Sequence, residues 1–168
     1  DRRQEITAFT VLSTYTEQQL HKLFERYGEV TNAKTLARAI VSIRGHQSLR
    51  TVANFKEALH AVVKGNPNRY FAQVFQALRM EVNDELGALQ DLMHQLPEVM
   101  KPGGRVAVIT FHSLEDRVVK EFGRERTRDY TFTGEVDVPE LRRSRAPEMK
   151  WVSRKAILPG EIELKENP

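Results

Sequence analysis

Residues 101–117 read Lys-Pro-Gly-Gly-Arg-Val-Ala-Val-Ile-Thr-Phe-His-Ser-Leu-Glu-Asp-Arg, and this stretch decides the predicted fold class. Its Pro-Gly-Gly opening predicts a tight turn, because glycine supplies the positive φ that such turns need. Residues 105–111 are then almost continuously apolar and rich in β-branched side chains, which is typical of a parallel strand buried on both faces. Ser113 and Asp116 next favour a helix start, as an N-cap and as negative charge in the first turn. Turn, buried strand and helix in this order predict an α/β fold with part of a doubly wound sheet.

His112 and Ser113 lie where this predicted strand ends, at the edge of an open α/β sheet where ligands bind. We therefore expect them to line a ligand cleft and to contact the substrate. The alternative is that Ser113 and Asp116 only cap the helix. Both interpretations can hold together, because a helix N-terminus also attracts phosphate. A serine hydrolase is disfavoured, because the G-x-S-x-G elbow is absent and adjacent Ser and His side chains rarely reach productive geometry.

The first half of the chain carries the three-and-four spacing of apolar residues that predicts amphipathic helices. Capping signals at Thr16 and Thr51 mark two helix starts, and Asn66-Pro67-Asn68 begins a longer helical stretch. A kink or break is predicted at Gly87, and an end or bend near Leu96, before Pro97. We therefore divide the chain into a helical subdomain, residues 1–66, and an α/β part, residues 67–168.

Residues 123–150 lose this periodicity, and we expect a surface loop with a short helix at 140–143, followed by a second strand at 151–157. A basic patch in this region encloses Glu148 and Trp151, and its members are Arg142, Arg143, Arg145, Lys150, Arg154 and Lys155. Basic side chains beside an aromatic ring suit single-stranded nucleic acid, because the charges follow phosphates and the ring stacks on a base. The alternative is a solvated loop with a core tryptophan.

The 168 residues have a formal net charge of +3, which permits a nucleic-acid partner without requiring one. The absence of cysteine excludes a disulfide scaffold, a thiolate zinc site, an iron–sulfur cluster and a cysteine nucleophile. The five histidines show neither an HxH nor an HExxH pattern, so no metal site is expected. No apolar run approaches the roughly 18–20 residues that span a bilayer, and we expect a cytoplasmic protein without a membrane partner.

Two segments carry a specific family resemblance. Residues 75–86 read FQALRMEVNDEL, and residues 101–117 read KPGGRVAVITFHSLEDR. In this combination they closely resemble the ribosomal RNA small subunit methyltransferase H family. The segments at 14–17 and 37–40 are similar to the helical insertion of that family, and the tail at 157–159 and 166–168 is similar to the start of its C-terminal pattern. The resemblance covers nearly the whole chain and is weakest at 123–150.

This resemblance implies a class I S-adenosylmethionine-dependent methyltransferase fold, which is a doubly wound, Rossmann-like sheet with an inserted all-helical subdomain. It implies methyl transfer to the exocyclic amine of a cytosine in the decoding region of small-subunit ribosomal RNA. On the substrate side we then expect His112 and Ser113 to line the target-base pocket or to contact the RNA backbone. Arg117 and the basic-patch residues Arg142, Arg143 and Arg145 are expected to meet RNA phosphates.

The family's glycine-rich cofactor loop and its ribose-binding acidic residues have no counterpart in this sequence, whose one Gly-Gly pair stands in the later KPGG position. We therefore expect the C-terminal part of such an enzyme, without cofactor-binding residues, unable to bind S-adenosylmethionine or transfer a methyl group alone. Catalytic residues stay unassigned. Two alternatives stay open: a non-catalytic RNA-binding or assembly fragment, and a structural piece that folds only with its missing half or as a tight oligomer such as a homodimer.

Overall fold

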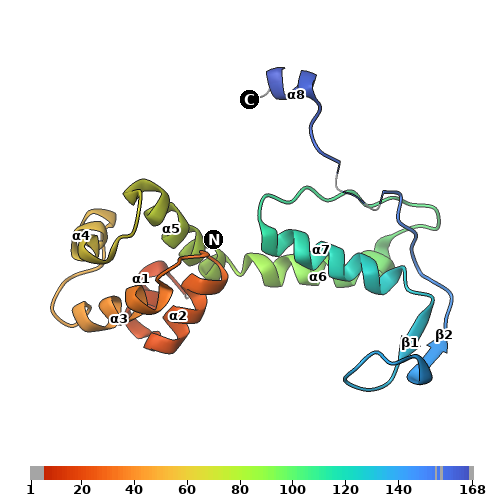
Figure 1. Ribbon diagram of the computed structural model, residues 1–168, viewed down its shortest axis with the longest axis horizontal. Coiled ribbons are helices and arrows are strands. Elements are labelled where there is room, and N and C mark those ends of the chain that lie inside the picture. Colours follow the sequence, from red (N-terminus) through yellow and green to blue (C-terminus); the bar gives the residue numbers. More distant parts are fainter. Residues whose placement is uncertain (1–5, 154, 156, 167–168) are drawn as a thin grey trace. The chain divides into compact units, whose positions relative to one another are not determined.

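The computed structural model describes residues 6–153, 155 and 157–166, and these residues form mainly helices (Figure 1). They divide into two compact units, Asp1–Leu89 (unit 1) and Gln90–Pro168 (unit 2). The sequence-based division placed the boundary at residue 66, more than twenty residues earlier than the division by packing. Each unit is described below by itself.

Unit 1 is a bundle of short helices around one hydrophobic core. Its elements are α1 (Ala8–Thr14), α2 (Glu17–Arg26), α3 (Ala33–Ile43), α4 (Val52–Ala58), the 3-10 helix η1 (His60–Val62) and α5 (Pro67–Asn83). Three predicted helix starts are confirmed, because Thr16, Thr51 and Asn66 each accept a hydrogen bond from a backbone N–H of the first turn. Helix α5 packs against α1 and α2, so it belongs to this unit.

The core of unit 1 lies where α2, α3 and α5 meet. Phe24, Ile40 and Val74 contribute fully buried side chains, one from each helix. Burial of each such side chain contributes about 1.5–3 kcal/mol. Gly28 follows α2 at a point of close approach, because a Cβ there would lie 2.8 Å from the backbone oxygen of Gln73 in α5. The absence of a side chain at Gly28 therefore lets α2 and α5 pack closely.

Two polar contacts tie the helices of this unit together. The buried Asn32 amide donates to the Val62 carbonyl at 2.8 Å, and its side-chain oxygen accepts a hydrogen bond from the Tyr70 hydroxyl at 3.0 Å. Burial raises the pKa of Tyr70. The Tyr15 hydroxyl donates to Glu81 Oε1 at 2.7 Å, and this bond raises the pKa of Tyr15 to about 12. The buried side chains of Asn32 and Tyr70 thus have hydrogen-bond partners, as a stable core requires.

The break after α5 lies at Asp84 rather than at the predicted Gly87, and α6 (Glu85–Val99) follows it. Asp84 has a left-handed backbone, with φ 47° and ψ 46°. Its carboxylate lies against Gly87, where a Cβ would be 2.4 Å away, so the glycine makes room for that carboxylate. Pro97 lies inside α6, so the helix does not end near Leu96, whereas a bend there stays a prediction. A proline in the last turn removes few helical hydrogen bonds.

Unit 2 continues with α7 (Ser113–Arg126), β1 (Tyr130–Phe132), the 3-10 helix η2 (Pro139–Leu141), β2 (Arg142–Ser144) and α8 (Glu161–Glu166). Strands β1 and β2 form an antiparallel hairpin, with Thr131 opposite Arg143. This hairpin follows α7 directly (Figure 1). The short helix predicted at 140–143 is confirmed only at its start, because the 3-10 helix η2 ends at Leu141 and the chain then enters β2.

The predicted buried strand at 105–111 is also wrong. These residues have no regular secondary structure, and Ile109 and Phe111 are 82% and 93% exposed. A parallel strand needs neighbours for its N–H and C=O groups, and the only strands in the described part of the chain are β1 and β2, which pair with each other. No strand is found at 151–157 either, where 154 and 156 lie outside the described residues. The described residues thus do not form a doubly wound sheet.

Candidate functional site

His112, not Ser113, is the N-cap of α7. Its backbone is extended, with φ −135° and ψ 144°, and its imidazole Nδ1 accepts a hydrogen bond from the Leu114 backbone N–H at 3.2 Å. Ser113 is the first residue of the helix itself, so the predicted Ser113 cap is wrong. The sequence is ambiguous here, because an imidazole nitrogen can accept the capping hydrogen bond just as a serine hydroxyl can. His112 therefore has a structural role that sequence reasoning missed.

A second side chain fixes the same helix entry. The Glu115 carboxylate accepts a hydrogen bond from the Phe111 backbone N–H at 2.9 Å, reaching back across the start of α7. This resembles the second half of a capping box, displaced by one residue. Glu115 stands three residues after the N-cap, which is the signal that predicts such a contact. The backbone around His112 and Ser113 is thus held from both sides.

Arg117 lies on the solvent side of α7 and is exposed. It makes no hydrogen bond or ion pair with any residue that the structure describes. The neighbouring Lys120, by contrast, pairs with Asp116 at 2.7 Å. Arg117 is therefore exposed to solvent, and its contact with an RNA phosphate stays a prediction.

Arg142 is held by its own hairpin. Its Nε lies 2.7 Å from Asp137 Oδ1, and its guanidinium lies 4.3 Å from the ring centre of Tyr130. The Tyr130 hydroxyl donates to the other Asp137 oxygen at 2.7 Å. The hydrogen bonds from Tyr130 and Arg142 lower the pKa of Asp137, and the same contacts raise the pKa of Tyr130 and of Arg142. Asp137 and Tyr130 were not identified from the sequence.

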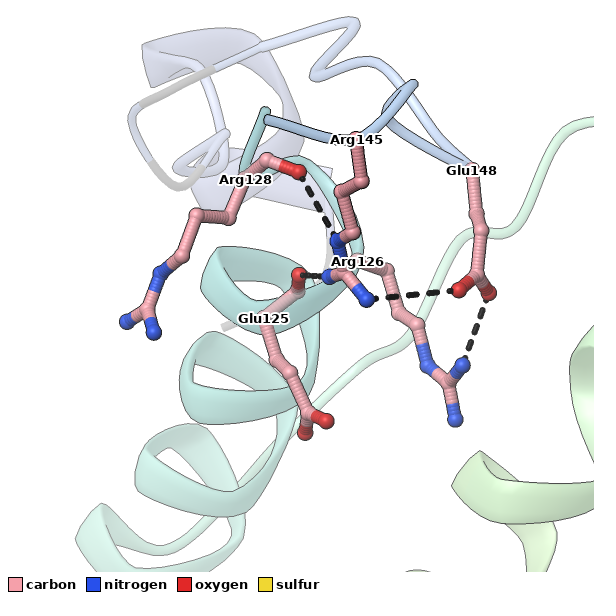
Figure 2. A network of polar contacts seen from close by, with 5 residues as sticks. All are labelled: Glu125, Arg126, Arg128, Arg145 and Glu148. Carbon is pink, nitrogen blue, oxygen red and sulfur yellow. Dashed lines mark hydrogen bonds and ion pairs between the residues drawn. The ribbon is translucent and has the colours of Figure 1, made fainter. Parts of the chain in front are cut away.

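Arg145 reaches back to the end of α7, as Figure 2 shows. Its guanidinium donates to the backbone carbonyls of Glu125 and of Arg128, the latter at 3.3 Å. Glu148 joins it at 3.7 Å and also pairs with Arg126 at 2.7 Å (Figure 2). A cation on the last carbonyls of a helix satisfies acceptors that have no partner within the helix. Arg145 is thus part of the fold of unit 2.

Arg143 differs from both of these arginines. It occupies the centre of β2, opposite Thr131, and both residues are exposed. It makes no hydrogen bond or ion pair with a described residue. The structure therefore brings Arg142 and Arg145 into internal contacts and leaves Arg143 in solvent.

Trp151 rests on α7. The edge of its six-membered ring lies at Gly123, where a Cβ would be only 2.2 Å from the ring atom Cη2. The residue is still 40% exposed, so it is neither a buried core tryptophan nor a freely presented ring. Lys150 and Lys155 are exposed, whereas Arg154 lies outside the described residues.

Other classes of site find little support in the described part of the chain. No group of three or more His, Asp or Glu side chains there is placed to hold a metal ion. No described helix has both the length and the apolar character needed to cross a bilayer. One hollow of unit 1 is lined by Phe9, Arg44, His46 and Arg50.

The sequence matches the MraW methylase family over residues 1–168. Three similar proteins are each named ribosomal RNA small subunit methyltransferase H. The protein from Bacteroides thetaiotaomicron is 38% identical over 173 residues, which cover 100% of this chain and 54% of the relative. The protein from Amoebophilus asiaticus is 41% identical, and the match covers 98% of this chain and 52% of the relative. The protein from Cytophaga hutchinsonii is 47% identical, and the match covers 73% of this chain and 41% of the relative. The chain spans about half the length of these relatives.

Proposed function

This chain belongs to the MraW methylase family, and we propose that the whole enzyme transfers a methyl group from S-adenosylmethionine to the exocyclic amine of a cytosine in small-subunit ribosomal RNA. The observation that carries this proposal is the family match along all 168 residues, together with the name of the relatives. Because the chain spans about half of those relatives, the activity is proposed for the complete enzyme and the RNA-facing role for this chain. We also propose a cytoplasmic location, where such RNA is found.

The described residues do not fit the cofactor. A cofactor loop of this class joins a strand to a helix, so that backbone N–H groups face the ligand. Gly103, with φ 80°, instead turns the chain directly after α6 and leads into residues 105–111, most of which are exposed. A Cβ at Gly104 would lie only 2.6 Å from Met100 Cε, so this turn packs against the end of the preceding helix. No catalytic step through the cofactor follows from these residues.

The exposed apolar residues 105–111 support a role in the sheet of the complete enzyme. We propose that they form a strand of a class I methyltransferase sheet when neighbouring strands are present, with residues 1–66 as an inserted helical domain. Val106, Ile109 and Phe111 are all large and exposed, and pairing would remove their surfaces from water.

His112, Ser113 and Arg117 are the proposed substrate contacts at the start of α7. S-adenosylmethionine carries an activated methyl group, so the protein's task is to position the cytosine amine and to handle its proton. The cytosine must leave any stack to reach the methyl group. Because His112 Nδ1 serves the helix cap, a substrate contact would use Nε2.

The arginines of the basic patch are proposed to meet RNA phosphates, and Arg143 is the one that no described contact occupies. Its exposure and its lack of a described partner support this role. Arg142 and Arg145 are retained as contacts, but an RNA phosphate would compete there with Asp137 and with Glu148.

Titration of the chain with a small-subunit RNA hairpin and, separately, with S-adenosylmethionine tests this proposal. We expect salt-dependent, saturable RNA binding and no saturable binding of the cofactor. Absence of RNA binding would contradict the RNA-facing role. Saturable cofactor binding at micromolar concentration would contradict the conclusion that the described residues do not fit the cofactor.

A further inference from the structure

We propose that the solvent face of α7 and the aromatic face of the β1–β2 hairpin form one track for a single-stranded RNA segment. This inference rests on the proposed function, because it assigns part of the RNA contact to particular residues. The cations of α7 would follow the phosphates, and the rings of the hairpin would stack with unpaired bases.

The cations of α7 form a stripe along one side of the helix. Arg117, Lys120 and Arg124 are separated by three and four residues, so they share a face. Phe122, which is half-buried, stands on the opposite side of the helix. Like Arg117, Arg124 is exposed and makes no hydrogen bond or ion pair with a described residue.

Two carboxylates stand beside the three cations of the stripe. Asp116 pairs with Lys120 at its edge, and Glu121 stands beside Arg117 and Arg124 without forming an ion pair with either. Two unpaired guanidinium groups therefore remain, one near each end of the helix. Guanidinium groups suit this task because their planar donors match phosphate oxygens.

The aromatic face begins where α7 ends. The guanidinium of Arg128 lies 5.2 Å from the ring centre of Tyr130 and 5.5 Å from that of Phe132. Arg142 covers Tyr130 from the paired strand at 4.3 Å. Nucleic-acid bases stack both on aromatic rings and on guanidinium planes.

The hairpin is held in place before any ligand arrives. Asp137 binds both the Tyr130 hydroxyl and Arg142, and the Arg145 backbone N–H donates to the Asp129 carbonyl at 2.8 Å. Because these contacts already order the side chains, a base that stacks there loses little of its binding energy to ordering the protein. Rings together with cations favour a single strand, since a duplex keeps its bases stacked inside.

The test measures binding of the chain to a short single-stranded RNA and to an abasic strand of equal length and charge. The double variant Arg117→Gln/Arg124→Gln should lower the slope of log K against log salt by about 1.4, which is about 0.7 per lost phosphate contact. The matched control Lys64→Gln/Arg69→Gln removes two exposed cations from unit 1 and should leave the slope unchanged.

The variant Phe132→Leu should weaken binding of the RNA at least about fivefold, because the loss of one stacked base costs about 1 kcal/mol or more. It should leave binding of the abasic strand unchanged. Tyr130→Phe keeps the ring but loses the bond to Asp137, so it should retain most of the RNA affinity, while Tyr130→Leu should reduce it further. Circular dichroism of each variant checks that the helices are intact.

Three results would overturn the track. Equal affinity of the wild-type chain for the RNA and the abasic strand would show a purely electrostatic surface without base stacking. Wild-type RNA binding that all track variants retain unchanged would place the RNA elsewhere and leave the proposed function standing. No RNA binding by the wild-type chain would overturn the track and the RNA-facing role together.

Discussion

The imidazole of His112 caps α7 by accepting a hydrogen bond from the Leu114 backbone N–H at 3.2 Å. The same residue is the proposed substrate contact at the helix start. Loss of activity on its replacement would therefore have two causes, one structural and one chemical. Separating them requires a replacement that restores only the cap.

His112→Ala should lower the free energy of unfolding by about 1 kcal/mol, the usual value of one capping hydrogen bond. His112→Asn should restore most of this stability, because the asparagine side chain accepts the same bond. Chemical denaturation of both variants measures the difference. Equal stability of His112→Ala and wild type would contradict the cap.

Arg145→Ala should lower the free energy of unfolding by about 2 kcal/mol, because its guanidinium donates to carbonyls at the end of α7. The matched variant Arg143→Ala removes an exposed arginine two residues away and should change stability by less than about 0.5 kcal/mol. For RNA binding we expect Arg143→Ala to reduce the salt dependence. An unfolding experiment in which the two variants lose equal stability would contradict the structural role of Arg145.

Gly123→Ala should not stabilise the protein, although alanine normally favours a helix interior by about 1 kcal/mol over glycine. The new methyl group would meet the Trp151 ring, which lies 2.2 Å from the Cβ position. In a Trp151→Leu background, the same change should add about 1 kcal/mol. A thermal-unfolding double-mutant cycle measures this coupling. Additive effects would show that Trp151 does not rest on α7.

The Tyr15–Glu81 hydrogen bond should make stability depend on pH in the alkaline range. The unfolded chain loses the Tyr15 proton near pH 10, whereas the folded chain keeps it until about 12. The contribution is therefore fully present below pH 10 and is lost as the pH rises toward 12. Tyr15→Phe should lack this component. The prediction would be contradicted if the free energies of unfolding of the wild type and of Tyr15→Phe changed equally with pH from pH 9 upward.

Local signals predicted the helices of unit 1 well. Thr16, Thr51 and Asn66 cap helices as expected, because a cap depends on residues within one turn. The break at Asp84 was missed because a non-glycine residue adopts the left-handed backbone there, and Gly87 serves the carboxylate of that residue. The sequence pattern can indicate that a helix ends in a region, but it does not show which residue adopts the left-handed backbone that ends it.

The apolar segment 105–111 was predicted as a strand for a sound local reason, but strand formation depends on distant partners. The sites show the same limit. Arg117 and Arg143 were found by charge and are exposed, whereas the internal partners of Arg142 and Arg145 are contacts that spacing does not reveal. The rings of Tyr130 and Phe132 were overlooked because nothing in the sequence shows Arg128 lying over them.

The central claim is tested most directly by methyl transfer from a completed enzyme, in which this chain replaces the matching half of the Bacteroides thetaiotaomicron relative. The enzyme is incubated with S-adenosylmethionine and small-subunit RNA. The RNA is then digested to nucleosides, which are separated and identified by mass spectrometry. We predict one added methyl group on the exocyclic amine of a cytosine. A correctly folded enzyme that leaves the RNA unmethylated, or that methylates another nucleoside, would contradict the account.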